Sequence, residues 1–315
     1  MVSNFARIDV SDWEKLAYGE PGGDAGKDWF YEPGTSKRMW LYKAATMKQA
    51  KVKVVDGGGT RQYRRGEDWA EKVCAELAAL IGLPAATVEL AVRDGLQGNI
   101  SLSVRPHSWQ LHGAGAKLAE IDPRYVTWSE DNKVRNPIGH NLDNIERVLD
   151  DVLPPPMSTE TAFTAFDVFA GYLLFDAWVA NTDRHDQNWA ILETEHGQEI
   201  LSPSFDHGTA LGSGMETAQH ATADVDSWAH RGFAHRFEDG QKRLLLDLAW
   251  DALDRASPLA RTYWVTAIAS IRTEAWDTVL DSVPEMSPQT SKFVSSVLRI
   301  NQERISHGSQ HGSVS

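Results

Sequence analysis

A burst of polar residues interrupts apolar sequence at 179–192, VANTDRHDQNWAIL. Asp183 and Asn188 lie five residues apart here, and Asp206 follows a short predicted hairpin in the sequence FDHG. We expect these three side chains to converge on one point because two adjacent loops carry them. Asp206 and Asn188 offer the hard oxygen ligands that suit Mg²⁺ beside phosphates, and Asp183 is placed to accept a proton from a hydroxyl. The pattern therefore predicts phosphoryl transfer.

Phosphoryl transfer also needs a cation on the phosphates that are not transferred. Lys43 is the candidate, and Glu71 on a later helix is the carboxylate that would orient it. Strand lysines usually point to solvent, and Glu67 and Glu76 compete with Glu71 on the same helix. The chain order Lys, Glu, Asp-x4-Asn, Asp is nevertheless the order found in a two-lobed kinase.

The elements that must position these residues change character along the chain. Residues 38–45 read as a strand, 67–83 as a helix, and 87–106 as two strands joined at Asp94 and Gly95. A helix apolar nearly all round then runs over 159–181, capped by Ser158 or Thr159, and further helices follow. We predict an α+β fold with a strand-rich lobe over 1–106, a helical lobe over 107–305 and a disordered tail at 306–315.

Composition restricts the partners. The 315 residues carry a net charge of -13, from 44 acidic and 31 basic residues, so we expect no direct binding to nucleic acid. The single cysteine, Cys74, excludes an intrachain disulfide and fits a reducing compartment. The start of the chain has no apolar signal region and no window is apolar enough to span a bilayer, which favours a cytoplasmic protein without a membrane partner.

These motifs resemble the HipA-like serine/threonine kinase family, and more distantly the phosphoinositide kinases. The resemblance rests on NTDRHDQNW, FDHGTALG, GTSKRMWLYK and AEKVCAELAALIGLP. It implies a protein-kinase-like fold, the cofactors ATP and Mg²⁺, a protein Ser/Thr substrate and the possibility of a regulatory partner protein. By position, the resemblance implies that Asp183 is the catalytic base and that Asn188 and Asp206 are the metal ligands. It implies that Lys43 binds the nucleotide with Glu71 as its partner, and that Gly34, Thr35 and Ser36 form the phosphate-covering turn. Residues 101–106 would be the strand that leads into the hinge. The turn lacks the G-x-G-x-x-G pattern of other kinases.

Two other functions stay open from the residues alone. A metal-dependent hydrolase could use Asp183, His185, Asp206 and His207 as ligands, and a non-catalytic nucleotide-binding module could keep the kinase fold. Arg184 could neutralise a phosphorylated or acidic loop or pair with Asp186 or Glu193 at the surface, and the sequence favours neither role.

A histidine-rich stretch occupies the position of an activation segment. Its irregular spacing favours a mobile polar loop over a zinc site for His207, His220, His230 and His235. By position, the candidate autophosphorylation sites in it are Ser213, Thr217, Thr222 and Ser227.

Overall fold

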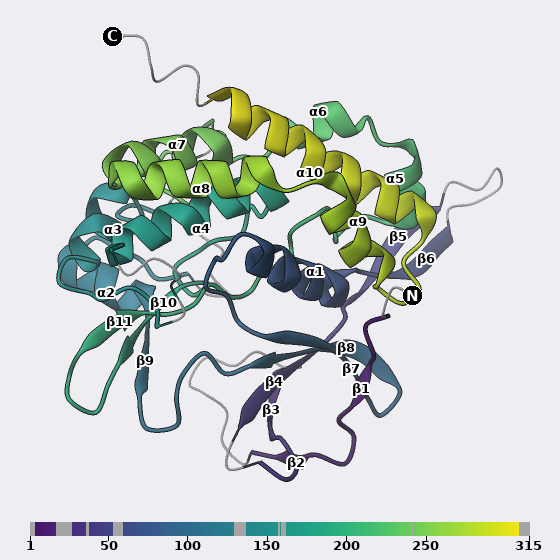
Figure 1. Ribbon diagram of the computed structural model, residues 1–315. Coiled ribbons are helices and arrows are strands. Elements are labelled where there is room, and N and C mark those ends of the chain that lie inside the picture. Colours follow the sequence, from purple (N-terminus) through teal and green to yellow (C-terminus); the bar gives the residue numbers. More distant parts are fainter. Residues whose placement is uncertain are drawn as a thin grey trace.

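A strand-rich lobe and a helical lobe face each other, with one helix lying between them (Figure 1). The structure is a computed structural model that describes residues 4–16, 27–35, 38–52, 59–128, 137–156, 158, 162–240 and 242–308. The two-lobed α+β fold predicted from the sequence is confirmed.

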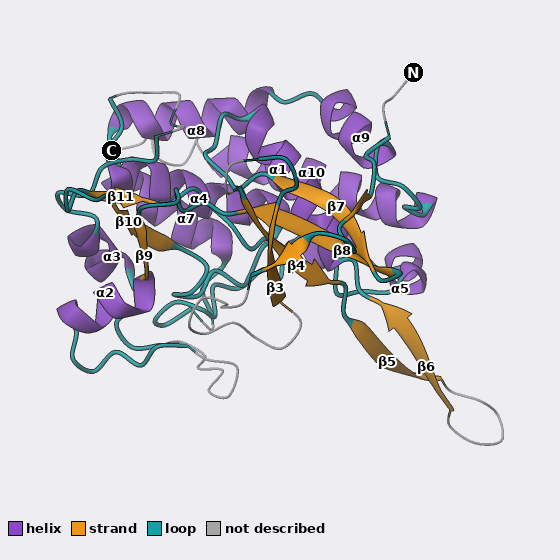
Figure 2. Ribbon diagram, turned by 90° about the horizontal axis from the view of Figure 1, so that it is seen from below, coloured by secondary structure: helices purple, strands orange, loops and turns teal. Residues whose placement is uncertain are grey.

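The first lobe is built on a six-stranded sheet of order β1-β7-β8-β4-β3-β2. Its strands are β1 (Ile8–Asp9), β2 (Glu14–Lys15), β3 (Lys27–Tyr31), β4 (Met39–Ala44), β7 (Val88–Arg93) and β8 (Leu96–Leu102). The turn between β7 and β8 falls at Asp94 and Gly95, which both have positive φ (49° and 77°), as a tight two-residue hairpin requires. A separate hairpin, β5 (Met47–Val52) with β6 (Gly59–Arg64), projects away from this sheet (Figure 2).

Helix α1 (Glu67–Leu80) belongs to the chain's first lobe but packs into the core of the second. Its buried residues Val73, Cys74 and Leu77 join the large hydrophobic cluster formed by the helical lobe, whereas the sheet has a small cluster of its own around Phe30, Trp40 and Ile100. Helix α1 therefore connects the two lobes through its buried apolar side chains. Because Glu71 lies on this helix, its position is fixed relative to both lobes.

The second lobe combines a small sheet with helices. The sheet has the order β11-β10-β9, from β9 (Gln110–Gly113), β10 (Ala190–Glu193) and β11 (Glu199–Leu201). The helices are α2 (Ala114–Ile121), α3 (Leu142–Val148), α4 (Ala165–Val179), α5 (Thr217–Thr222), α6 (Val225–Ala229), α7 (Leu245–Arg255), α8 (Pro258–Ser270), α9 (Thr273–Asp281) and α10 (Pro288–Gly308). The proposed lobe boundary at residue 106 falls in the connection between β8 and β9.

Helix α4 delivers the polar motif and is buried along its whole length. Its cap differs from the prediction: Thr164 accepts from the backbone N–H of Asp167, whose side chain accepts from the N–H of Thr164 in return. This capping box satisfies two N–H groups at once and starts the helix later than the apolar pattern suggests. The predicted cap Thr159 lies outside the described residues, and Ser158 lies before the helix.

Two stretches are more ordered than predicted. The activation-segment position contains the short helices α5 and α6 instead of a mobile loop. Helix α10 continues to Gly308, so residues 306–308 are helical, and buried Ile305 anchors this end. Residues 309–315 of the predicted tail lie outside the described part of the chain. Within the described residues, no helix has the length and apolarity needed to cross a membrane.

Candidate active site

Lys43, Glu71 and Asp206 meet where the two lobes adjoin. Lys43 in β4 places its Nζ 3.5 Å from Oε1 of Glu71 in α1 and 3.0 Å from Oδ1 of Asp206. The other carboxylate oxygen of Glu71, Oε2, accepts the backbone N–H of His207 at 2.9 Å. Glu71 therefore contacts both the strand lysine and the loop that carries Asp206.

The charges of this group are strongly coupled. Burial raises the pKa of Glu71 to about 7, against the opposing effect of Lys43. Burial also lowers the pKa of Lys43, but the carboxylates of Asp206 and Glu71 outweigh it and hold the pKa above the usual value. Lys43 therefore stays a cation, as a phosphate-binding lysine must.

The loop that carries Asp206 is fixed against the first lobe. Ser204 donates its N–H to the carbonyl of Pro84 and accepts the N–H of Ala86, at 2.9 and 2.8 Å. Asp206 itself adopts a left-handed backbone with φ of 63°. Aspartate tolerates this conformation better than most residues, and such backbones are concentrated at functional sites.

The loop after α4 is held by its own hydrogen bonds. The Asn188 side chain donates from Nδ2 to the backbone carbonyl of Asp183 at 2.7 Å, and the Asn188 N–H donates to the carbonyl of His185. Because the amide nitrogen is turned toward the backbone, the amide oxygen lies at the opposite end. Asn188 is 3% exposed, and this hydrogen bond sets the orientation of its amide.

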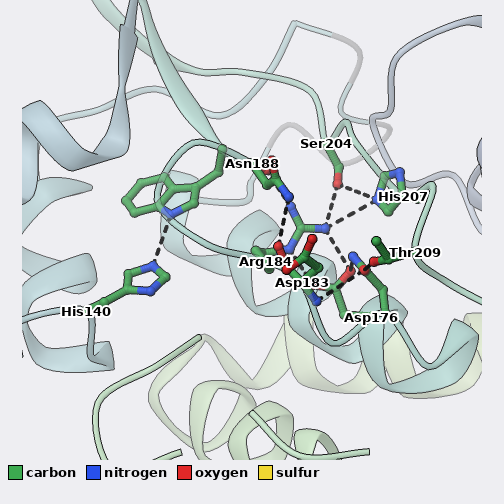
Figure 3. Close-up of polar contacts among 10 residues, drawn as sticks. His140, Asp176, Asp183, Arg184, Asn188, Ser204, His207 and Thr209 are labelled. Atoms are coloured by element: carbon green, nitrogen blue, oxygen red, sulfur yellow. Dashed lines mark hydrogen bonds and ion pairs between the residues drawn. The ribbon is translucent and has the colours of Figure 1, made fainter. Parts of the chain in front are cut away.

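Arg184 joins this loop to the loop of Asp206 (Figure 3). Its guanidinium pairs with both carboxylate oxygens of Asp176 in α4, and Nη1 donates to the carbonyl of Asn188 at 2.9 Å. Nη2 also reaches Ser204 Oγ at 2.9 Å and His207 Nε2 at 3.3 Å. One buried guanidinium therefore holds the backbone of Asn188 and the neighbour of Asp206 together.

The position of Arg184 corrects the surface pairing with Asp186 or Glu193 considered from the sequence. The residue is 1% exposed and its carboxylate partner is Asp176, which sequence reasoning missed. Asp176 lies near the end of the mostly apolar helix α4, beyond the capping residue Asp167, and was the available signal, because a buried carboxylate needs a partner.

The histidines of the hydrolase alternative make internal contacts. His185 stacks on Trp128 with ring centroids 3.9 Å apart, and His207 Nε2 lies 2.9 Å from Ser204 Oγ. Burial, with the charge of Arg184, lowers the pKa of His207 to about 3, so the ring is neutral and accepts hydrogen bonds. In the ranges that the structure describes, no three His, Cys, Asp or Glu residues are grouped so that they could hold a metal ion.

The remaining histidines of the activation segment do not gather either. His220 is buried, with Nδ1 3.1 Å from Thr290 Oγ1 and Nε2 3.1 Å from the carbonyl of Gly212, while His230 is exposed. Of the candidate phosphorylation sites, Ser213 is buried and donates to the carbonyl of Gly208, whereas Thr217 and Thr222 are exposed on α5. Ser227 bonds to Asp224 at the start of α6.

Asp183 is paired with an arginine that sequence reasoning missed. Its Oδ1 accepts from Nε and Nη2 of Arg236, at 2.7 and 2.6 Å. Arg236 lies beyond α6, directly after His235 in the histidine-rich stretch, where Arg231 likewise follows a histidine and no recognisable pattern singles out either arginine.

The predicted phosphate-covering turn connects β3 and β4. Gly34 has φ of 74° there, and Thr35 donates both its N–H and its hydroxyl to the carbonyl of Glu32. Ser36 lies outside the described residues. The predicted hinge strand ends at Leu102, and the chain then bends through Ser103 and Arg105.

The donor set fits Mg²⁺ held jointly with phosphate oxygens. One carboxylate, Asp206, and one amide oxygen, Asn188, are too few protein ligands for a closed metal site, and both are hard oxygen donors. The Asp206 side chain is 33% exposed, so a ligand can reach it.

Comparison with known proteins places the fold. No protein-family model matches the sequence, and no curated protein does. Among solved structures, the chain is similar to the Helicobacter pylori proinflammatory kinase CtkA, at 16% identity and a TM-score of 0.69, over 98% of this chain and 100% of that one. It is also similar to HipA in the Shewanella oneidensis MR-1 complex of HipA, HipB and operator DNA, at 13% identity and a TM-score of 0.50, over 92% of this chain and 66% of that one. The chain has the HipA-like, protein-kinase-like fold.

Proposed function

We propose that this protein is an ATP- and Mg²⁺-dependent phosphotransferase that acts on serine or threonine hydroxyls of a protein. One observation carries the proposal: Lys43 Nζ lies between Glu71 and Asp206, at 3.5 and 3.0 Å, although a strand, a helix and a loop of different lobes supply the three residues. Phosphoryl transfer needs such a lysine, held in place by carboxylates, next to the metal-binding position.

Each residue has a role that its contacts support. Lys43, steadied by Glu71, binds the phosphates that are not transferred. Asp206 and Asn188 would hold Mg²⁺, which when bound neutralises charge on the phosphates. Asp183 receives the proton of the acceptor hydroxyl.

The acceptor and partner belong to the proposal as well. A protein hydroxyl is the acceptor that the motif resemblance implies. A regulatory partner protein is proposed by analogy with HipA, whose structure contains HipB. We propose no direct contact with nucleic acid because the chain carries a net charge of -13.

Binding and transfer are tested separately. Thermal shift of the purified protein is measured with ATP, with Mg²⁺ and with both, followed by radiolabel transfer from ATP to the protein itself and to a cell lysate. We expect stabilisation that needs ATP and Mg²⁺ together, and label on proteins; label only on lipid or small molecules would reject the protein acceptor.

Two variants separate the roles. Asp183→Ala should abolish transfer and keep nucleotide binding, whereas Asp206→Ala should also lose the Mg²⁺-dependent binding. An exposed carboxylate, Asp254→Ala, is the matched control and should behave as wild type. Nucleotide binding by wild type with no transfer to any acceptor would identify a non-catalytic nucleotide-binding module instead, and an active Asp183→Ala enzyme would reject this base.

A further inference from the structure

We propose that Arg236 is a further catalytic residue, which holds the base Asp183 and contacts the phosphoryl group during its transfer. This inference rests on the proposed function. It begins from the ion pair between Arg236 and Asp183, whose N–O distances are 2.7 and 2.6 Å.

The arginine next to the base cannot serve this purpose. Arg184 is 1% exposed, and its Nε, Nη1 and Nη2 all donate to groups of the protein, as Figure 3 shows. Moving it toward a ligand would leave Asp176 buried without its counter-charge. Lys43 is held by Glu71 and Asp206 on the nucleotide side.

The backbone of Arg236 is fixed to the second lobe. Its carbonyl accepts Nδ1 of His140 at 2.6 Å, and the N–H of Glu238 donates to the carbonyl of His140 at 2.8 Å. Between them, buried Phe237 stacks on His140 with ring centroids 4.4 Å apart. The Glu238 carboxylate accepts the N–H of Gly139 at 2.9 Å. These contacts on both sides of Arg236 favour a permanent position over a transient one.

The guanidinium is also oriented. It lies over the ring of Trp128, 5.7 Å from the centroid, and Trp128 is stacked on His185. Both bonds to Asp183 come from one edge of the guanidinium, Nε and Nη2, and end on one oxygen, Oδ1. The third nitrogen, Nη1, points away from the edge that binds Asp183, and 15% of the Arg236 side chain is exposed to solvent. A planar fork with one edge on a carboxylate can present the other to phosphoryl oxygens.

This geometry fits the charge changes of the reaction. The acceptor hydroxyl gives its proton to Asp183 as its oxygen bonds to the γ-phosphorus, and the bond from phosphorus to the β–γ bridging oxygen breaks to leave ADP. Negative charge on the transferred group is stabilised by a fixed cation, and an arginine that contacts this group raises turnover by about 10³- to 10⁵-fold in related phosphoryl transfer. Arg236 would supply that cation beside the base.

The test compares Arg236→Met, which keeps the apolar stem over Trp128, with Arg236→Lys, which keeps the charge and loses the fork. Arg231→Met is the matched control, because Arg231 is an exposed arginine of the same segment. Titration calorimetry measures the affinity for Mg²⁺-ADP alone and with aluminium fluoride, which mimics the phosphoryl group in transfer. Thermal melting and radiolabel transfer are recorded for each variant.

We expect Arg236→Met to bind Mg²⁺-ADP within about twofold of wild type, to lose most of the extra affinity that aluminium fluoride gives, and to transfer phosphate roughly 10³-fold more slowly. Arg236→Lys should recover part of both losses, and Arg231→Met should match wild type. Unchanged fluoride-dependent affinity in Arg236→Met would overturn the proposal, as would a loss of ADP binding and folding in both Arg236 variants, since that describes a structural residue. Two other outcomes would reject the proposed function and not the role of Arg236. In the first, the wild-type protein does not bind Mg²⁺-ADP; in the second, Lys43→Met binds Mg²⁺-ADP as tightly as the wild type.

Discussion

Two polar networks lie side by side in this molecule and differ in burial. The network around Arg184 is closed: Arg184 and Asp176 are at most 1% exposed, and each guanidinium nitrogen donates to a protein group. The network around Lys43 is open, with 20% of the Lys43 side chain and 33% of the Asp206 side chain exposed.

We interpret the closed network around Arg184 as structural and the open network around Lys43 as the place where a ligand can bind. A closed ionic network has no donor to give to a ligand, and disrupting it leaves an uncompensated buried charge. An open network loses less on disruption because water and a ligand can replace the missing partner. Arg184 therefore holds the loops that carry Asn188 and Asp206, and Lys43 stays accessible to a ligand beside them.

The largest effect is expected when the closed network loses its cation. Arg184→Met should destabilise the protein by about 3–5 kcal/mol, because Asp176 stays buried without its partner. Urea unfolding followed by circular dichroism measures this, with exposed Arg231→Met as the control. A loss below about 1 kcal/mol would show that the network is not the scaffold.

Acid should lower the stability of the protein through His140, whose ring binds the carbonyl of Arg236. Burial lowers the pKa of His140 from 6.5 to about 4, and its neutral ring accepts Nε1–H of Trp189 while donating to the Arg236 carbonyl. An unfolded chain takes up this proton more readily, so the contribution of His140 is complete above pH 6.5 and is lost as the pH falls toward 4. Over this pH range, His140 should lower the free energy of unfolding by about 3 kcal/mol.

The measurement is the free energy of unfolding from pH 8 to pH 4 for wild type, His140→Gln and the exposed control His196→Gln. His140→Gln should be less stable at neutral pH and show a shallower decline. His207 responds to acid in the same direction, so the difference between variants is the quantity of interest. Parallel curves for all three would contradict the assignment.

A smaller loss of stability is expected at Ser204, where the closed network connects the loop of Asn188 to the loop of Asp206. Ser204 Oγ lies 2.9 Å from both Arg184 Nη2 and His207 Nε2. Ser204→Ala should cost about 1–2 kcal/mol, since both partners lose a buried hydrogen bond. Urea unfolding measures it, and exposed Ser270→Ala, whose hydroxyl bonds locally within α8, is the control. No difference between these two variants would mean that Arg184 holds the loops without Ser204.

The smallest change in stability is expected in the open network. Lys43→Met should stay within about 1 kcal/mol of wild type, because Lys43 is partly exposed and Glu71, whose pKa is already raised, can take up a proton. Mg²⁺-ADP binding should nevertheless fall by at least about tenfold. Unfolding as severe as that of Arg184→Met would remove the distinction between the two networks.

Local patterns predicted most of the fold and named several residues that come together. The apolar run before Asn181 predicted α4, and Asp94 with Gly95 predicted the β7–β8 turn. The incomplete predictions involve contacts made only in the folded chain: the buried partner of Arg184, Asp176, was missed, and the stretch containing α5 and α6 was predicted to be mobile. His220 illustrates the reason, because its neighbour Thr290 lies seventy residues away.

The sequence alone determined which chemical groups are present and which elements carry them, because periodicity, turn residues and motif spacing are local properties. The tertiary structure decided which arginine is buried against Asp176 and which one faces Asp183. That choice depends on desolvation and on partners 8 and 53 residues distant, and neither can be read from the neighbours of an arginine in the chain.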